Sequence, residues 1–480
     1  MKLTLFLLTI VFSVFSACQN QTNKTNALNE VGLTNPNIIY ILADDLGYGD
    51  LSCYGQTKFK TPNIDKMADE GMLFTQHYAG CTVCAPSRSS LMTGQTTGHT
   101  FIRGNKEWVP EGQYPLEAKA ITIAEVLKEV GYTTGGFGKW GLGFVGTEGD
   151  PNSQGFDEFY GYNCQRLAHN YFPGHLWDNN KKVILEGNTD DKFTEYAPEL
   201  IHKRALQFIE KNRDKPFFLF YPNTIPHAEL LLPEDELKEF RGKYLPEKKY
   251  KGSEFGDKRF RTGGYGTQPE SHAAFAAMVT LLDKQVGEVL DKLKELGLDK
   301  NTIVIFTSDN GPHLEGGADP NYFNSNGIYK GFKRDLYEGG IREPMIAWWP
   351  GKIKAGTTNN HISAFWDMMP TFAELAGAKT PENIDGISML PTILGEDGQN
   401  QHDYLYWEFH EKGGRKALRK GDWKLVNYNV NKPEKATIEL YNLIDDPGEE
   451  NNVADSHPEL VKELTKLINS ARTESEVFKF

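Results

Sequence analysis

Short apolar runs that each end in a polar loop constrain the fold of this chain more than any other feature. Five strands are predicted on this basis, at 37–42, 132–137, 216–221, 301–306 and 345–349, of which 132–137 is much less apolar than the others and is predicted from its place after a helix. Nearly continuous apolar stretches of this length are typical of strands buried in a parallel sheet. A capping-box sequence opens a predicted helix at 122–131, and 273–296 has the pattern of a long amphipathic helix. The alternation predicts an α/β fold with a sheet flanked by helices.

Oxygen-bearing side chains follow two of these predicted strands. Asp44 and Asp45 come directly after the first run, and Asp309 and Asn310 follow the fourth. In open α/β sheets, ligands bind at the carboxyl ends of the strands. A set that offers only oxygens favours a hard cation, and calcium over magnesium because its coordination tolerates mixed ligands. The alternative interpretation is a pair of ordinary charged turns.

The segment around Cys84 has an unusual composition. It reads C-x-P-S-R from Cys84 to Arg88, and L-x-T-G follows. The Pro-Ser pair favours a helix start, so we expect Cys84 at a helix N-terminus, where N–H groups attract anions. Cys81 and Cys84 also form a C-x-x-C, which is compatible with half of a zinc site or with a redox pair. Neither alternative explains the proline, serine and arginine that follow.

These segments together resemble the type I sulfatases, from about residue 37 to the final predicted helix. In that family the cysteine is oxidised after synthesis to formylglycine, whose hydrate attacks sulfur. The resemblance implies an alkaline-phosphatase-like fold, with a large mixed sheet flanked by helices. It implies a metal site formed by both oxygen-bearing pairs and residue 84. It also implies a maturation enzyme as a partner, and a role for Arg88 in bracing the formylglycine.

Two lysines match further motifs of the family. Lys139 lies in a G-K-W-x-L-G segment, and Lys333 precedes Tyr-Glu-Gly-Gly by four residues. We expect both to hold sulfuryl oxygens, because preorganised cations stabilise a transition state with spread charge. The segment around Lys139 also matches G-x-G-x-x-G, but no helical pattern follows, which disfavours a dinucleotide site. Family members often have histidine in place of Gly141, which leaves open what holds the hydrated aldehyde.

A histidine after the 216–221 run is the candidate general acid. His227 belongs to a Pro-His segment that matches the family, and its alternative role is structural. The alcohol of a sugar is a poor leaving group, so a proton donor should accelerate the reaction. In the loops, His313 and Arg103 are expected to contact substrate.

The N-terminal residues have the pattern of an export signal. A lysine precedes an apolar run at 3–15, and Phe-Ser-Ala-Cys18 resembles a bacterial lipoprotein box. We expect a signal over 1–18, lipidation of Cys18 and a polar tether over 19–35. The alternative is a plain secretory signal. The expected location is the bacterial cell envelope, lipid-anchored on the periplasmic side or at the cell surface.

The composition limits the partners. The formal net charge of −13 disfavours nucleic acid as a ligand. Five cysteines are too few for a disulfide framework, and at most one disulfide is expected. We expect the catalytic domain over 36–395, and over 396–480 a smaller antiparallel subdomain with a helix.

The prediction is an exported sulfatase that hydrolyses sulfate esters of carbohydrates, such as oligosaccharides derived from polysaccharides, with formylglycine and calcium. Two alternatives stay open. One is a phosphoester hydrolase on the same scaffold. The other is a non-catalytic surface lipoprotein that binds sulfated glycans.

Overall fold

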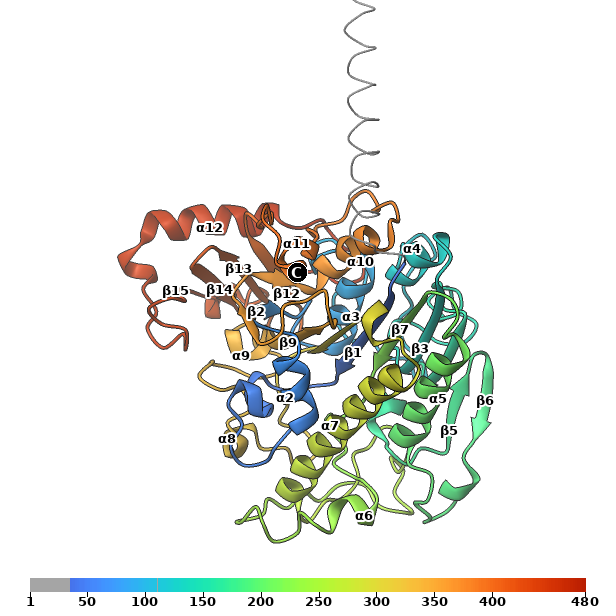
Figure 1. Cartoon of the computed structure of the whole chain (residues 1–480). Helices are drawn as coiled ribbons and strands as arrows, with labels where there is room; N and C mark the ends of the chain where they lie inside the picture. The colour runs from blue at the N-terminus through green and yellow to red at the C-terminus, as the bar shows by residue number, and fades with distance from the viewer. Residues whose placement is uncertain (1–34, 110) are drawn as a thin grey trace, which may run out of the picture.

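A large mixed sheet runs through the molecule, as a computed structural model that describes residues 35–109 and 111–480 shows (Figure 1). Its order is β10-β2-β9-β8-β1-β7-β3-β4-β5-β6, with β11 paired to β2. The strands are β1 (Asn37–Ala43), β2 (Met72–Tyr78), β3 (Thr133–Lys139), β4 (Glu158–Tyr162), β5 (His175–Asp178), β6 (Lys181–Ile184), β7 (Phe217–Pro222), β8 (Thr302–Ser308), β9 (Arg342–Trp348), β10 (Thr357–Asn359) and β11 (Ser363–Ala364).

The five predicted strands form the centre of this sheet. β8, β1, β7, β3 and β4 are parallel neighbours, whereas β9 runs antiparallel between β8 and β2. Every residue of β1, β7, β8 and β9 is buried, which explains the largely apolar sequences of β1, β7 and β8, whereas β9 begins with the buried charged residues Arg342 and Glu343. The prediction of a mixed sheet flanked by helices is confirmed.

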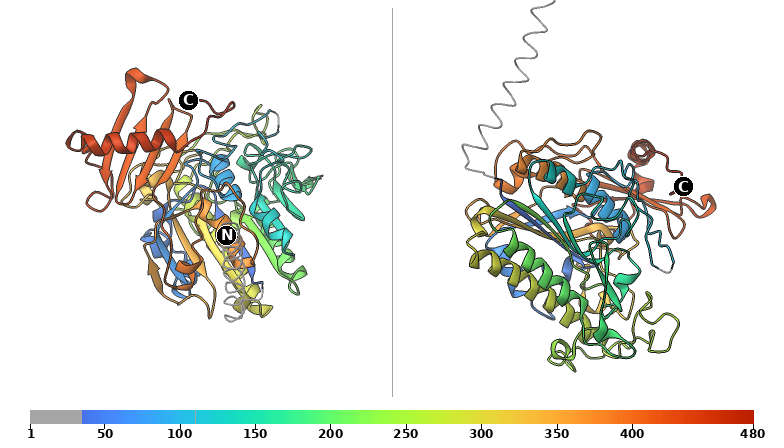
Figure 2. Two further views of the ribbon diagram at one scale, coloured as in Figure 1. Left: turned by 90° about the horizontal axis from the view of Figure 1, so that it is seen from above. Right: turned by 90° about the vertical axis from the view of Figure 1, so that its right-hand side faces the viewer.

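Helices cover both faces of the sheet (Figure 2). Alternate residues of β1 divide between the two cores: Ile39 and Ile41 pack on one face, and Ile38 and Tyr40 on the other. The first core includes α2 (Pro62–Asp69), α5 (Ala197–Lys211) and α7 (Ser271–Glu295), and the second includes α3 (Cys84–Thr93), α4 (Ile123–Glu129) and α10 (Met368–Ala376). Shorter helices are α6 (Glu234–Leu237), α8 (Pro320–Phe323), α9 (Glu338–Ile341) and α11 (Leu390–Leu394).

A second, four-stranded antiparallel sheet follows, in the order β12-β13-β14-β15. Its elements are β12 (Leu405–Phe409), β13 (Arg415–Lys420), β14 (Trp423–Tyr428), β15 (Thr437–Asn442) and the helix α12 (Pro458–Ser470), which packs on the sheet. This sheet contacts the segment that follows Lys333. Arg415 donates to the carbonyl of Arg334, the Tyr428 hydroxyl accepts from Leu336 N at 3.0 Å, and Lys424 Nζ lies 2.9 Å from Glu338 Oε1.

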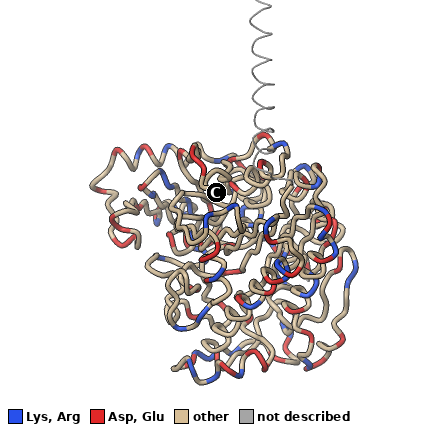
Figure 3. The backbone as a smooth tube through the Cα atoms, viewed as in Figure 1, with Lys and Arg blue, Asp and Glu red and all other residues tan. Residues whose placement is uncertain are grey.

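The predicted signal at 1–18, lipidation of Cys18 and nearly all of the tether lie outside the described residues. Among the helices that the structure describes, none has the length and hydrophobicity needed to cross a membrane. The cysteines within the described part, Cys53, Cys81, Cys84 and Cys164, are all free thiols. Lys and Arg residues are interspersed with Asp and Glu along the part of the chain that the structure describes (Figure 3).

Candidate active site

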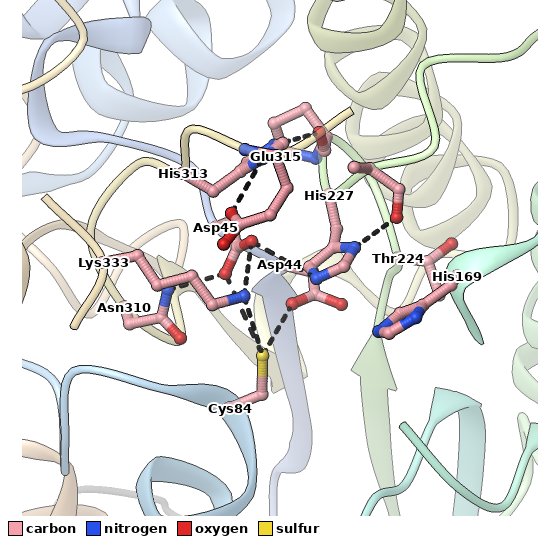
Figure 4. Close-up of polar contacts among 12 residues, drawn as sticks. Asp44, Asp45, Cys84, His169, Thr224, His227, Asn310, His313, Glu315 and Lys333 are labelled. Atoms are coloured by element: carbon pink, nitrogen blue, oxygen red, sulfur yellow. Dashed lines mark hydrogen bonds and ion pairs between the residues drawn. The ribbon is translucent and has the colours of Figure 1, made fainter. Parts of the chain in front are cut away.

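Cys84 lies at the meeting point of several segments (Figure 4). It is the first residue of α3, as predicted, and it is buried. Its sulfur is 3.3 Å from Asp44 Oδ1, 3.4 Å from Lys139 Nζ and 3.7 Å from Lys333 Nζ. Burial, reinforced by Asp309 and Asp44, raises the pKa of the thiol well above its ordinary value. An unmodified Cys84 is therefore not activated as a thiolate.

The neighbouring cysteine does not join this cluster. The Cys81 thiol faces the carbonyl oxygen of Glu408 at 3.5 Å and packs with Val83 and Phe409. Its pKa is raised to about 12 by burial. A zinc half-site needs two thiolates and a redox pair needs at least one, whereas burial raises the pKa of both Cys81 and Cys84, so the structure disfavours both alternatives.

The two oxygen-bearing pairs converge because β1 and β8 are parallel neighbours, with Ala43 paired to Ser308. Asn310 Nδ2 donates to Asp45 Oδ1 at 2.6 Å, and the backbone N–H of Asp45 donates to Asp309 Oδ1 at 3.1 Å. Asp45 lies in the left-handed backbone region, with a φ of 64°. The Oδ1 of Asn310 is buried without a partner.

These residues fit a divalent cation. Ligand atoms of Asp44, Asp45, Cys84 and His227 all lie within 4.8 Å of one another. Together with the unpartnered Asn310 Oδ1, they offer mainly hard oxygen donors. Burial alone would raise the pKa of Asp44, but nearby cations, Lys139 first among them, hold that pKa well below its usual range. The carboxylate is therefore ionised and ready to coordinate a cation.

Arg88 contacts the aspartate cradle, which is formed by Asp44, Asp45 and Asp309, and the bracing of formylglycine by Arg88 stays a prediction. Its Nε and Nη2 both donate to Asp309 Oδ2, at 3.0 and 2.8 Å, and its Nη1 donates to the carbonyl of Lys139. The guanidinium and the carboxylate are both fully buried. Arg88 therefore fixes one predicted metal ligand against the end of β3.

Two ammonium groups flank the sulfur. Lys139 Nζ lies 2.7 Å from Asp44 Oδ2, and Lys333 Nζ lies 2.8 Å from Asp45 Oδ2. Burial would lower the pKa of each lysine, but the carboxylates outweigh it and raise both values. Both lysines are therefore charged and can attract an anion.

His227 lies between two further imidazoles. The ring of His169 stacks on it at 5.2 Å between centroids, and the ring of His313 at 5.5 Å. Nδ1 of His227 contacts the carbonyl of Ala228, so this nitrogen carries a proton, and Nε2 faces Asp45 Oδ2 at 3.4 Å. Burial first, and then Lys333, lower its pKa well below the ordinary value. A lone pair facing a carboxylate is repulsive, so this arrangement requires a proton or a cation between the two atoms.

The structure separates the two predicted substrate contacts. His313 belongs to the cluster: its Nε2 contacts the carbonyl of Pro226 at 3.1 Å, and its Nδ1 accepts from the N–H of Glu315. Arg103 does not join it, which is a correction. Its guanidinium is buried, at 3.2 Å from Glu408 Oε1 and 2.7 Å from the carbonyl of Thr473, so it ties the chain's end to the domain.

The sequence interpretation missed His169 and Glu315. His169 ends a short 3-10 helix after β4, and Glu315 follows His313 and pairs with Arg334. A weak signal existed for Glu315, since it lies only two residues from a predicted contact. An isolated histidine in an irregular segment gave none.

The match to a family model decides the class of this site. The Sulfatase model matches residues 36–378, which is more than half of the chain. The chain belongs to the sulfatase family. A second model, for the C-terminal part of N-sulphoglucosamine sulphohydrolase, matches residues 327–474 of this sulfatase.

The similarity between this sulfatase and its relatives covers almost the whole chain. It is 30% identical to an N-acetylgalactosamine-6-O-sulfatase of Bacteroides thetaiotaomicron, over 96% of this chain and 97% of the relative. It is 32% identical to arylsulfatase A of Homo sapiens, over 90% and 87%. The crystal structure of Ps i-CgsB in complex with k-i-k-neocarrahexaose is similar with a TM-score of 0.75 and 30% identity, covering 91% of this chain and 92% of that one. The protein is a sulfuric ester hydrolase with an alkaline-phosphatase-like fold.

Proposed function

We propose that this sulfatase removes sulfate from carbohydrates, with residue 84 as formylglycine and with calcium, rather than magnesium, as the metal. The observation that carries the proposal is the position of Cys84, surrounded at 3.3–3.7 Å by a carboxylate and two ammonium groups. Names of relatives support a sugar substrate: one is an N-acetylgalactosamine-6-O-sulfatase, and another was crystallised in complex with k-i-k-neocarrahexaose.

The charges of the site suit an anionic ester. Asp44, Asp45 and Asp309 are balanced by Arg88, Lys139 and Lys333. A divalent cation held by the aspartates and Asn310 would add two positive charges, polarise the sulfuryl group and orient the attacking oxygen. A sulfate monoester brings one negative charge, so its binding is favoured by electrostatics.

The residues of the chain then have distinct roles. In its formylglycine form, residue 84 would supply a hydrated aldehyde as the nucleophile, and Asp44, whose Oδ1 lies 3.3 Å from the sulfur of Cys84, would hold its hydroxyl group. Lys139 and Lys333 hold sulfuryl oxygens while the bond between sulfur and the sugar oxygen breaks. His227 is the proposed donor of the proton that the departing sugar oxygen needs, and because burial and Lys333 lower its pKa in the free site, the ring takes up that proton only once the anionic ester lies beside it. Asp45, facing Nε2 at 3.4 Å, stabilises the protonated ring.

One experiment tests the assignment. The protein is coexpressed with a formylglycine-generating enzyme, the Cys84 peptide is examined by mass spectrometry, and regiodefined sulfated sugars are screened beside an aryl sulfate and an aryl phosphate. We expect an aldehyde at residue 84 and turnover of sulfated sugars. Turnover of aryl sulfate alone would refute the carbohydrate substrate, and faster turnover of the phosphate would favour a phosphoester hydrolase. An intact thiol in active protein would refute the formylglycine.

We also propose export and lipid anchoring through Cys18 in the bacterial cell envelope. The support is the sequence around Cys18 and the polar segment behind it. Metabolic labelling with a radioactive fatty acid should label the wild-type protein and not Cys18→Ala. Equal labelling of the two proteins would exclude this anchor.

A further inference from the structure

Two buried amide side chains extend the end of β4 beside Lys139. The backbone N–H of Trp140 donates to the carbonyl of Tyr162 at 2.9 Å, and that of Gly141 donates to the carbonyl of Asn163 at 3.0 Å. These bonds continue the pairing of β3 and β4 past the last strand residues. Asn163 and Gln165 are therefore fixed relative to the strand end that carries Lys139, with side chains only 1% and 2% exposed.

Three polar atoms of these amides have no hydrogen-bond partner. They are Nδ2 and Oδ1 of Asn163 and Nε2 of Gln165. A buried donor or acceptor left unpaired forfeits its bonds to water and gains nothing in return, so native proteins rarely keep one without a protein group, an ordered water or a ligand as partner. The three unpaired atoms belong to two side chains that are two residues apart, Asn163 and Gln165, and this grouping points to a polar ligand.

Gln165 fills the space that residue 141 leaves open. A Cβ at Gly141 would lie 2.1 Å from Gln165 Nε2, and the φ of Gly141 is +79°, where side chains are strained. The glycine thus admits the amide of Gln165 two residues from Lys139, whose Nζ is 3.4 Å from the sulfur of Cys84.

A second segment, residues 105–113, contacts both Gln165 and Ala85, the residue after Cys84. The backbone N–H of Gln165 donates to Gln113 Oε1 at 3.4 Å. At the other end of that loop, Asn105 Oδ1 accepts from the N–H of Ala85 at 3.1 Å. Gln165 is therefore held between two segments that touch residues 84 and 85.

We propose that Gln165 is a substrate-binding residue whose Nε2–H donates to a sulfuryl oxygen, with the Asn163 amide supporting the same group. The inference rests on the proposed sulfate-ester chemistry. A sulfuryl group has three non-bridging oxygens, and Lys139 and Lys333 approach from the end of β3 and from the loop between α8 and α9. An amide on the β4 side supplies a neutral donor to the remaining oxygen, satisfying its own unpaired hydrogen.

The test uses matured full-length enzyme with an aryl sulfate as substrate and inorganic sulfate as inhibitor, so that it does not depend on a sugar substrate. Gln165→Glu replaces the donor with a charge that repels the anion, and Gln165→Met removes the donor at similar volume. The matched control is Gln285→Glu, a buried glutamine whose Oε1 accepts from Tyr221 and Asn223 and keeps those bonds as a carboxylate.

We expect Gln165→Glu to lower kcat/KM by about 10²–10³-fold and to raise the inhibition constant of sulfate at least tenfold. Gln165→Met should show smaller losses of both with an unchanged melting temperature, and Gln285→Glu should match wild type in both. If Gln165→Glu does not fold, the methionine variant carries the test. An unchanged inhibition constant in a folded Gln165 variant, or equal losses in Gln285→Glu, would overturn the inference. Inactive wild type with formylglycine present would instead refute the proposed function.

Discussion

Arg88 and Asp309 form a forked contact in which two guanidinium nitrogens share one carboxylate oxygen, at 3.0 and 2.8 Å. A lysine at this position would keep the charge and lose the fork. We therefore expect Arg88→Lys to weaken activation by calcium about tenfold or more, because Asp309 loses its fixed orientation. A calcium titration of activity measures this, and unchanged activation would show that the fork does not orient the metal ligand.

The lysines beside the sulfur should act as a unit. Lys139→Met and Lys333→Met are each expected to lower kcat by about 10²–10³-fold, because each removes a preorganised charge from the transferring group. The double variant should lose less than the product of the single losses, since both lysines surround one centre. Strict multiplicativity in steady-state kinetics would argue for independent roles. Lys119→Met, at an exposed lysine, is the control.

The size of the rate loss on replacing His227 should depend on the leaving group of the substrate. His227→Gln is expected to lower kcat by about 10²–10⁴-fold on a sugar sulfate, whose alcohol needs a proton. The nitrophenolate group of a nitrophenyl sulfate leaves without being protonated, so turnover of this substrate should be affected much less. Comparison of the two substrates is the measurement, and equal losses on both would assign His227 to binding or structure.

Removal of the metal should abolish turnover and lower the melting temperature. Because the aspartate cradle is built in the folded state, a cation present at 100 times its dissociation constant adds about 2.7 kcal/mol to stability. Calcium is expected to restore activity to chelator-treated enzyme more effectively than magnesium. Better recovery with magnesium, or full activity in chelator, would contradict the assignment.

Glu343 gives a prediction for pH. Both its carboxylate oxygens are buried without partners, and burial, followed by Asp309, raises its pKa well above the ordinary value. The folded state therefore holds a proton that the unfolded state releases above about pH 4. The stabilisation that comes from protonated Glu343 is fully present below about pH 4, and it is lost as the pH rises through the raised pKa of the folded state.

Glu343→Gln removes this titration. Its melting temperature should equal that of wild type near pH 4 and exceed it at pH 8. Thermal melts across that range measure the difference. Parallel curves for the two proteins would show that Glu343 is not protonated in the folded state.

Much of the fold follows from local sequence. Strands such as β1 and β8 are fully buried, so their residues are continuously apolar and stand out, and parallel pairing alone brings Asp45 and Asn310 together. β2 is harder to predict because its burial is irregular. The placement of Arg103 depends on Thr473, which is 370 residues away, and no local pattern reports such a contact. The role proposed for Gln165 has no local sequence signal, because it depends on the space that Gly141 leaves open.

The small antiparallel sheet has a consequence for how such enzymes diverge. Its residues Arg415, Lys424 and Tyr428 form hydrogen bonds and an ion pair with the segment that follows Lys333. A chimera that exchanged this sheet for that of a distant relative would shift an ammonium group needed for turnover, even with every active-site residue retained. The position of the Lys333 ammonium group therefore depends on the large domain and on the small sheet together, so the two parts must change together in evolution.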